Sequence, residues 1–352
     1  MMPPANPDLN SVVKSRSYSS LWIWIRRLLS VLAFGVVLYL FWPLIGELRN
    51  ALHLFKEARW VWLGIALCIQ FISYICLTGL NYLLLVPFSG KIGFWRLMPI
   101  LPAMAFIEVA LPSAGLSGVV LRARLLHKNG YSAEASSFTL LMETIYIVAV
   151  MMIVSIAGIG YLLESGGIRL GQLAILAAIV GVLIGSSIVI YRIGRDKGRA
   201  LVWVERAVTR WNRLMRALRR PLISLESVVG RVNDFYDGLS QLKHVPPMVL
   251  LALATGRIVL DVATLGTCFI AFHYAIPLGI LITGYGLVLT FSGLAALPGG
   301  LGLVDASLAV IFARLGAPGS VAVAAALSYR LMAFWFVRFI GFVSWQLLEV
   351  RA

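Results

Sequence analysis

The amino-acid sequence predicts an all-α polytopic membrane protein, with about eight transmembrane helices and two broken or re-entrant segments. Of its 352 residues, 60% are hydrophobic and only 13% are charged, and the mean hydropathy is +0.91. Soluble domains carry about a quarter charged residues, so the composition argues against an ordinary soluble enzyme. The hydrophobic residues form continuous runs that can cross a hydrocarbon core of about 30 Å as helices. A transmembrane β-barrel would show short alternating segments instead.

The predicted helices follow from where each hydrophobic run meets charged or turn-forming residues. Tryptophans stand near several run ends, as expected for an aromatic belt at the membrane interface. Two shorter stretches, residues 113–127 and 299–315, begin with glycine-containing sequence and are the predicted broken or re-entrant segments. The eight runs are residues 28–48, 60–86, 95–111, 138–163, 170–191, 247–274, 278–297 and 321–348.

The basic residues predict the orientation of the chain in the membrane. Thirty Lys and Arg face fifteen Asp and Glu, a net charge of +15, and twelve of the basic residues lie in residues 192–246. Cytoplasmic loops collect Lys and Arg, so this pattern favours a membrane surface over nucleic acid as the partner. We therefore expect a cytoplasmic N-terminal segment (1–27) and a transmembrane domain (28–352) that contains a cytoplasmic insertion (192–246). The five predicted helices between the N-terminal segment and the insertion are an odd number and would place the two on opposite sides of the membrane. A cytoplasmic insertion therefore requires residues 113–127 to cross the membrane, or nearly cross it.

The insertion contains a predicted amphipathic helix over residues 199–218. Its apolar and basic residues follow helical spacing on opposite faces, which is typical of a helix lying at the lipid headgroups. A surface that binds a protein partner is the alternative. The apolar face comprises Leu201, Val204, Val208, Trp211 and Met215, and the basic face Arg206, Arg210, Arg213 and Arg216.

Catalytic and metal-binding motifs are absent from the sequence. It contains no phosphate-binding Walker loop, no His-Glu metal helix and no nucleophile elbow. The three cysteines and four histidines are scattered without ligand spacing. The sequence therefore predicts no cofactor, no metal site and no catalytic residues, and we expect a protein that is not an enzyme.

Two Leu-Pro segments predict an internal repeat. Residues 111–120 read LPSAGLSGVV and residues 297–305 read LPGGLGLVD, and parity starts them on opposite sides of the membrane. Glu143 follows Pro112 by 31 residues, and Arg330 follows Pro298 by 32. Inverted repeats of this kind build many secondary transporters, with the substrate site at their interface. A chance match between two apolar segments is the alternative.

Glu143 and Arg330 form the centre of the predicted substrate site. They hold equivalent places in the two repeats, and an arginine can hold a phosphate bidentately while a carboxylate balances it. A buried ion pair that only fixes helix packing is the alternative. The other predicted substrate-binding residues lie in or near the two broken segments: Pro112, Ser113, Gly115, Arg122, Arg124, Pro298, Gly299, Gly300, Gly302 and Asp305. Arg257 and Asp261, four residues apart on one helix, are the predicted structural ion pair.

These motifs resemble a known family. Residues 297–305, followed by Ser328, Tyr329, Arg330, Leu331 and Trp335, are similar to the transmembrane flippase-like domain of the lysylphosphatidylglycerol synthase family. Residues 111–124 and Met142-Glu143 are similar to that family's earlier motif. The resemblance covers most of the chain from the second helix onward. The chain departs from the family pattern at Ser113-Ala114, where glycine is expected, and at Thr144, where arginine often follows the glutamate.

The resemblance implies a multi-pass protein of the bacterial inner membrane, and we expect both termini in the cytoplasm. It implies a flippase-like transporter that moves or handles a phospholipid or an isoprenoid-type lipid between leaflets. We expect a stand-alone member without the aminoacyl-transferase domain of the full enzymes. The expected partners are anionic or isoprenoid membrane lipids, a lipid-modifying enzyme and a second copy of the chain. The alternative function is a non-transporting scaffold that docks a separately encoded lipid-modifying enzyme through residues 199–242.

Overall fold

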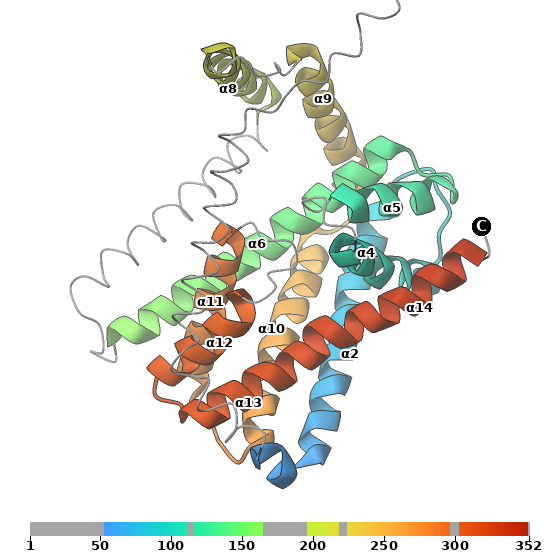
Figure 1. Cartoon of the computed structure of the whole chain (residues 1–352). Coiled ribbons are helices and arrows are strands. Elements are labelled where there is room, and N and C mark those ends of the chain that lie inside the picture. The colour runs from blue at the N-terminus through green and yellow to red at the C-terminus, as the bar shows by residue number, and fades with distance from the viewer. Residues whose placement is uncertain (1–52, 111–115, 165–195, 218–223, 296–302, 351–352) are drawn as a thin grey trace, which may run out of the picture.

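The computed structural model describes residues 53–110, 116–164, 196–217, 224–295 and 303–350 (Figure 1). Within these ranges the regular elements are helices, and no strand forms. The chain is a membrane protein, and four of its described helical stretches are long and apolar enough to cross a bilayer. They are α2 (Trp60–Leu85), Ala133–Gly158 within α6 (Ala133–Glu164), α10 (Pro247–Ala271), and Gly319–Leu348. The last stretch joins α13 (Gly319–Arg330), η3 (Leu331–Phe336) and α14 (Val337–Val350).

The other predicted spans differ in their outcome. The run at 95–111 is divided into α3 (Phe94–Leu97) and α4 (Ile100–Ala110), because Pro99 has no backbone N–H and interrupts the helix between them. The run at 278–297 corresponds to the apolar helix α11 (Leu278–Ala295), which has 18 residues. The predicted runs at 28–48 and 170–191 lie outside the described residues.

The helices α2 and α10 form an antiparallel pair at the centre of the bundle (Figure 1). At one end the Arg59 backbone N–H donates to the Ala271 carbonyl at 2.9 Å. Further along, a Cβ added to Gly256 would lie 3.3 Å from Cys76 Sγ. Small residues at such contacts let two membrane helices approach closely and gain van der Waals contact.

Two long helices pack against partners from the other half of the chain: α6 against α11, and α14 against α4. On the first pair Thr283 Oγ1 donates to the Gly158 carbonyl at 2.8 Å. On the second pair a Cβ added to Gly341 would lie 2.1 Å from the Pro102 carbonyl oxygen. Both interfaces therefore bring backbone against backbone, which only a small residue permits.

A short helix precedes each long one. α5 (Leu116–His127) and α12 (Leu303–Arg314) have 12 residues each. α6 has 32 residues, and the continuous helix that follows α12 is built from segments of 12, 6 and 14 residues. A 12-residue helix followed by a 32-residue helical stretch therefore occurs twice in the chain. The segments before α5 and α12, where the sequence predicts the breaks, lie outside the described residues.

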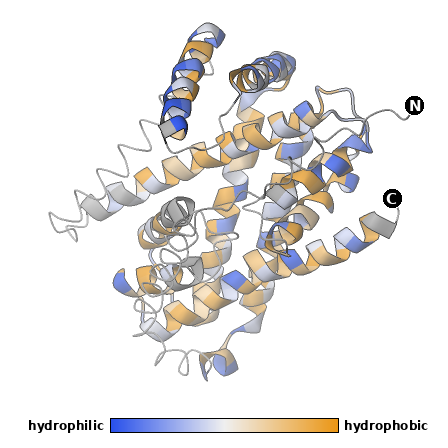
Figure 2. Cartoon of the chain, turned by 45° about the horizontal axis from the view of Figure 1, so that its top comes forward, coloured by the Kyte–Doolittle hydropathy of each residue, from blue (hydrophilic) through white to orange (hydrophobic). Residues whose placement is uncertain are grey.

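The predicted amphipathic helix is confirmed as α8 (Lys197–Ala217), which pairs with α9 (Leu225–Gln241) at one end of the bundle. The short helix η1 (Leu242–His244) then leads into α10. Phe235 of α9 packs against Phe138 of α6, with ring centroids 5.7 Å apart. On α8, Ala200 and Val208 are buried, and α8 packs against α9. Figure 2 shows hydrophilic residues concentrated on this hairpin, whereas the long helices are mostly hydrophobic.

Candidate functional site

Buried polar side chains gather in three clusters inside the helical bundle. Each contains at least one arginine, and charges inside membrane segments are costly unless they are paired or functional. We name them after a central residue: the Arg122 cluster, the Asp261 cluster and the Phe334 arginine pair.

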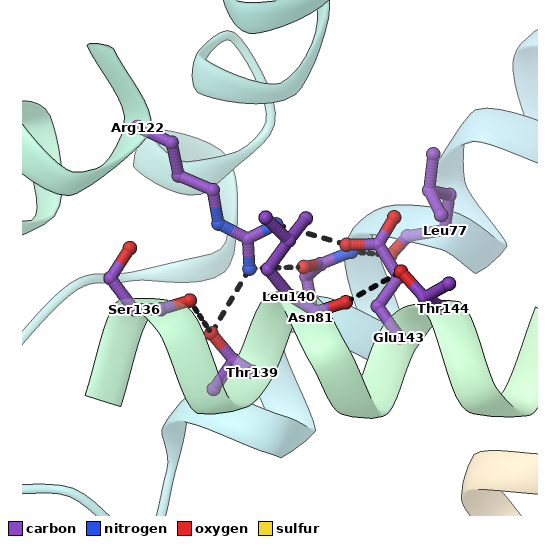
Figure 3. A network of polar contacts seen from close by, with 8 residues as sticks. All are labelled: Leu77, Asn81, Arg122, Ser136, Thr139, Leu140, Glu143 and Thr144. Carbon is purple, nitrogen blue, oxygen red and sulfur yellow. Dashed lines mark hydrogen bonds and ion pairs between the residues drawn. The ribbon is translucent and has the colours of Figure 1, made fainter. Parts of the chain in front are cut away.

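The Arg122 cluster joins three helices around one guanidinium (Figure 3). Arg122, on α5, is 1% exposed. Its Nη1 donates to Glu143 Oε2 at 2.9 Å, and its Nη2 donates to Asn81 Oδ1 at 2.7 Å and to Thr139 Oγ1 at 3.1 Å. Thr139 and Glu143 lie four residues apart on one face of α6, while Asn81 is held by its bond to the Leu77 carbonyl on α2. One arginine therefore meets one carboxylate, and the cluster is electrically neutral.

The Asp261 cluster joins four helices around one carboxylate. Arg257 Nη1 donates to Asp261 Oδ1 at 2.8 Å within α10. The hydroxyl groups of Tyr285 on α11 and Tyr329 on α13 both donate to Asp261 Oδ2, the second at 2.7 Å. Arg257 Nη1 also donates to Ser73 Oγ on α2 at 2.6 Å. Charge-assisted bonds of this kind are the stronger ones, and here they tie α2, α10, α11 and α13 together.

Tyr74 connects the polar clusters. The Arg257 guanidinium lies 5.5 Å from the centroid of its ring, a cation–π distance. Its hydroxyl also interacts electrostatically with Arg338, Asp261 and Glu143. Sequence reasoning could not single out this residue, because a tyrosine in an apolar run usually serves as a core aromatic with one polar end.

The Phe334 arginine pair lies where the last membrane helix widens into the π-helix η3. The guanidinium carbons of Arg330 and Arg338 lie 4.1 Å and 3.3 Å from the Phe334 ring centroid. Arg338 Nη1 donates to the Phe334 carbonyl at 3.1 Å, whereas its buried Nε has no hydrogen-bond partner among the described residues. Glu108 on α4 attracts Arg338 electrostatically. Two arginines and one nearby carboxylate leave this cluster positive.

Comparison with known proteins matches most of the chain to one family. The family model described as the lysylphosphatidylglycerol synthase TM region matches residues 27–341. The chain belongs to this family. The resemblance predicted from the Leu-Pro motifs is thereby confirmed. A UPF0104 membrane protein of Methanothermobacter thermautotrophicus is 25% identical over 327 residues, which cover 89% of this chain and 91% of that relative.

Glu143 and Arg330, the predicted centre of the substrate site, contact different residues in this member of the lysylphosphatidylglycerol synthase TM-region family. Glu143 receives the hydrogen bond from Arg122, and Arg330 lies over Phe334. Arg124 is exposed, and Asp305 is the third residue of α12. The remaining predicted substrate residues lie outside the described residues: Pro112, Ser113, Gly115, Pro298, Gly299, Gly300 and Gly302.

The structure brings together residues that the sequence could not connect. Asn81 and Thr139 reach Arg122 from 41 and 17 residues away, and no local spacing indicates either contact. Arg338 was visible only as one of several charges inside predicted membrane helices. Within the described ranges, no group of three or more His, Cys, Asp or Glu side chains could hold a metal ion.

Proposed function

We propose that the protein moves or handles lipids that carry a phosphate in the headgroup, on either a phospholipid or an isoprenoid-type lipid. Arg338 is the observation that carries this proposal. Its guanidinium has five N–H groups, yet it makes one hydrogen bond and no ion pair with the described residues. A cation in this state inside a membrane helix is stabilised by an anion that reaches it, and arginine holds phosphate oxygens bidentately.

Arg330 strengthens the attraction, because both guanidinium groups lie over the Phe334 ring. A stacked arginine keeps its N–H edge available, so the ring holds the Arg338 cation without using its donors. The headgroup would enter near Arg338 and Tyr74, while the acyl or isoprenoid chains stay in the bilayer. The neutral Arg122 and Asp261 clusters would hold the surrounding helices in place.

We also propose that the chain is built from two inverted repeats, α2–α6 and α10–α14. Four correspondences support this: α2 with α10, α4 with α11, α5 with α12, and α6 with the helix from α13 to α14. The helices α2 and α10 pair antiparallel with each other. Each long helix packs on the partner half, α6 on α11 and α14 on α4. A two-fold axis in the membrane plane exchanges these contacts, and transporter sites commonly lie on such an axis.

The basic hairpin of α8 and α9 favours a cytoplasmic position for the side on which α6 and α10 begin. With this orientation the protein would lie in a bacterial inner membrane with both termini in the cytoplasm. Under the proposed repeat, α6 and the helix from α13 to α14 run in opposite directions across the membrane. The two repeats would then open toward opposite leaflets, and the substrate could enter from either one.

Lipid movement in proteoliposomes tests this proposal. Fluorescent phospholipids in the inner leaflet lose their signal to external dithionite only when they cross the bilayer. We expect the wild-type protein to accelerate this loss, and Arg338→Gln to slow it at least about tenfold, the loss of roughly 1.4 kcal/mol. Arg314→Gln, which alters an exposed arginine at the end of α12, is the matched control. An unchanged rate for Arg338→Gln would overturn the assignment of the site.

A scaffold for a lipid-modifying enzyme is the second candidate, and the outer face of α8 favours it. Trp203, Arg206, Arg210 and Arg213 are exposed at helical spacing, while the buried residues of α8 face the hairpin. Such a face suits an acidic protein surface. If the protein is a scaffold, replacing these three arginines with glutamate would abolish binding of the enzyme and leave lipid movement unchanged. The transport proposal predicts no enzyme partner that the substitutions could release.

A further inference from the structure

A cavity of about 320 Å³ lies between α2, α3–α4 and the last membrane helix. Its walls are almost entirely apolar, and its residues include Leu67, Trp95, Phe336 and Ile340. Trp95 is 74% exposed, so the cavity is open at this residue. Arg338 is not among the lining residues, whereas Tyr74 is, so this cavity adjoins the proposed phosphate site without including its arginine.

Gln70 is the unusual residue of this cavity. It lines the wall from α2 and is only 2% exposed. Neither its amide nitrogen nor its amide oxygen has a hydrogen-bond partner among the described residues. Burying an amide without a partner costs about 1–3 kcal/mol, and nearly all buried polar groups in proteins avoid it. The amide therefore indicates that something else occupies the cavity.

Water is a poor occupant of this space. Besides Gln70, the polar groups that line the cavity are the hydroxyls of Tyr74 and Ser344 and the indole N–H of Trp95. A water fills only about 30 Å³ and needs two to four polar partners, so most of this apolar space of about 320 Å³ would hold no water. Gln70 lies about 15 Å along the helix from the start of α2 and about 22 Å from its end, so it sits near the middle of the bilayer. At this depth the helices are surrounded by lipid chains.

The chemistry of the amide restricts the ligand. A hydroxyl group both donates and accepts, so one hydroxyl can satisfy the nitrogen and the oxygen of Gln70 together. An ester carbonyl only accepts and would leave the amide oxygen unpaired. The volume lies at the lower end of the range for ligand pockets, which suits one apolar chain rather than two.

We propose that this cavity binds a single-chain lipid alcohol, with its hydroxyl hydrogen-bonded to the Gln70 amide and its chain against the apolar walls of α2, α4 and α14. The inference does not rest on lipid movement, because a lipid can bind here whether or not the protein is a transporter.

Photolabelling in lipid nanodiscs tests the proposal with two probes. One is hexadecanol with a diazirine in mid-chain, and the other is the corresponding hydrocarbon without the hydroxyl. We expect the alcohol to label peptides of α2 and α14 about tenfold more than the hydrocarbon, the effect of roughly one hydrogen bond of 1.4 kcal/mol. Gln70→Leu should reduce labelling by the alcohol to the hydrocarbon level. Gln346→Leu, an exposed glutamine on α14, should leave both unchanged.

A second variant distinguishes loss of lipid binding from loss of the fold. Ile340→Trp would fill the cavity and prevent labelling by both probes, while an unchanged melting temperature would show that the bundle is intact. Equal labelling of the wild-type protein by the two probes, or a preference for the alcohol that survives Gln70→Leu, would overturn the proposal. Loss of the preference in Gln70→Leu with normal lipid movement would support it and separate this cavity from the transport site.

Discussion

The two proposed repeats differ in how their buried charges are paired. In the first half, Glu143 is the eleventh residue of α6, and Arg122 from the preceding short helix neutralises it. In the second half, Arg330 is the twelfth residue of the corresponding helix, and the place of Arg122 on α12 is taken by the buried Ala309. A further arginine, Arg338, follows eight residues later.

The difference indicates a division of labour between the halves. A buried charge whose partners come from three helices fixes those helices, because moving any of them leaves a charge unpaired. A buried cation with few partners contributes little to packing and is free to meet an anion. The Arg122 and Asp261 clusters would therefore supply a rigid frame, and Arg338 in the second proposed repeat would supply the charge that a phosphate meets. The following predictions test this contrast, beginning with the largest expected effect.

Arg122→Ala should destabilise the protein by about 3–5 kcal/mol, because it leaves the Glu143 carboxylate in the bundle without its cation. Unfolding in detergent, followed by circular dichroism, measures this loss. Arg124→Ala removes an exposed arginine two residues further along α5 and should have little effect. A rigid frame also predicts that Arg122→Met combined with Glu143→Leu recovers much of the loss. Similar stability for both single variants would contradict the role of the cluster.

Tyr329→Phe should cost about 1.5–3 kcal/mol, the usual effect of losing a hydrogen bond to a charged group. The Tyr329 hydroxyl donates to Asp261 Oδ2 and links α13 to α10. Tyr146→Phe on α6 is the matched control, since no hydrogen bond of its hydroxyl is described among these residues. Equal unfolding free energies for the two variants would show that the Tyr329 bond does not hold α13 against α10.

Gly341→Ala should cost about 1–3 kcal/mol through overpacking, because the new Cβ would overlap the Pro102 carbonyl and push α14 away from α4. Gly160→Ala on α6 meets no atom within 4 Å and should be neutral or slightly stabilising. Thermal unfolding of the two variants side by side measures the difference. A neutral Gly341→Ala would show that α14 can shift, and the close contact would not be part of the frame.

Sequence reasoning predicted the parts of this architecture that depend on local signals. The predicted spans at 60–86 and 247–274 agree with α2 and α10 within three residues, because a continuous apolar run has the length of the bilayer core. The contact of Arg257 with Asp261 follows from i,i+4 spacing on a helix. The split at Pro99 was missed because hydropathy does not register a missing backbone N–H.

The candidate site depended on contacts between distant segments and was predicted only in part. Glu143 and Arg330 were selected for their equivalent positions in the repeat, yet the partner of Glu143 is Arg122, which sequence spacing alone could not assign. Gln70 stood in the sequence as a single amide in an apolar run, and only its burial without a partner distinguishes it. Pairing of buried polar groups on different helices is decided by tertiary packing, and helical periodicity carries no information about it.

Arg338→Gln should change the unfolding free energy least, by less than about 1 kcal/mol, while slowing lipid movement most. The substitution removes one hydrogen bond to the Phe334 carbonyl and one cation–π contact, but it also removes the cost of holding a poorly paired charge in the membrane. Detergent unfolding and the proteoliposome assay, performed on the same preparation, separate the two effects. Arg122→Ala should give the reverse pattern, with a large loss of stability. If Arg338→Gln destabilised the protein as much as Arg122→Ala, both arginines would be structural, and the second half would hold no cation reserved for a lipid phosphate.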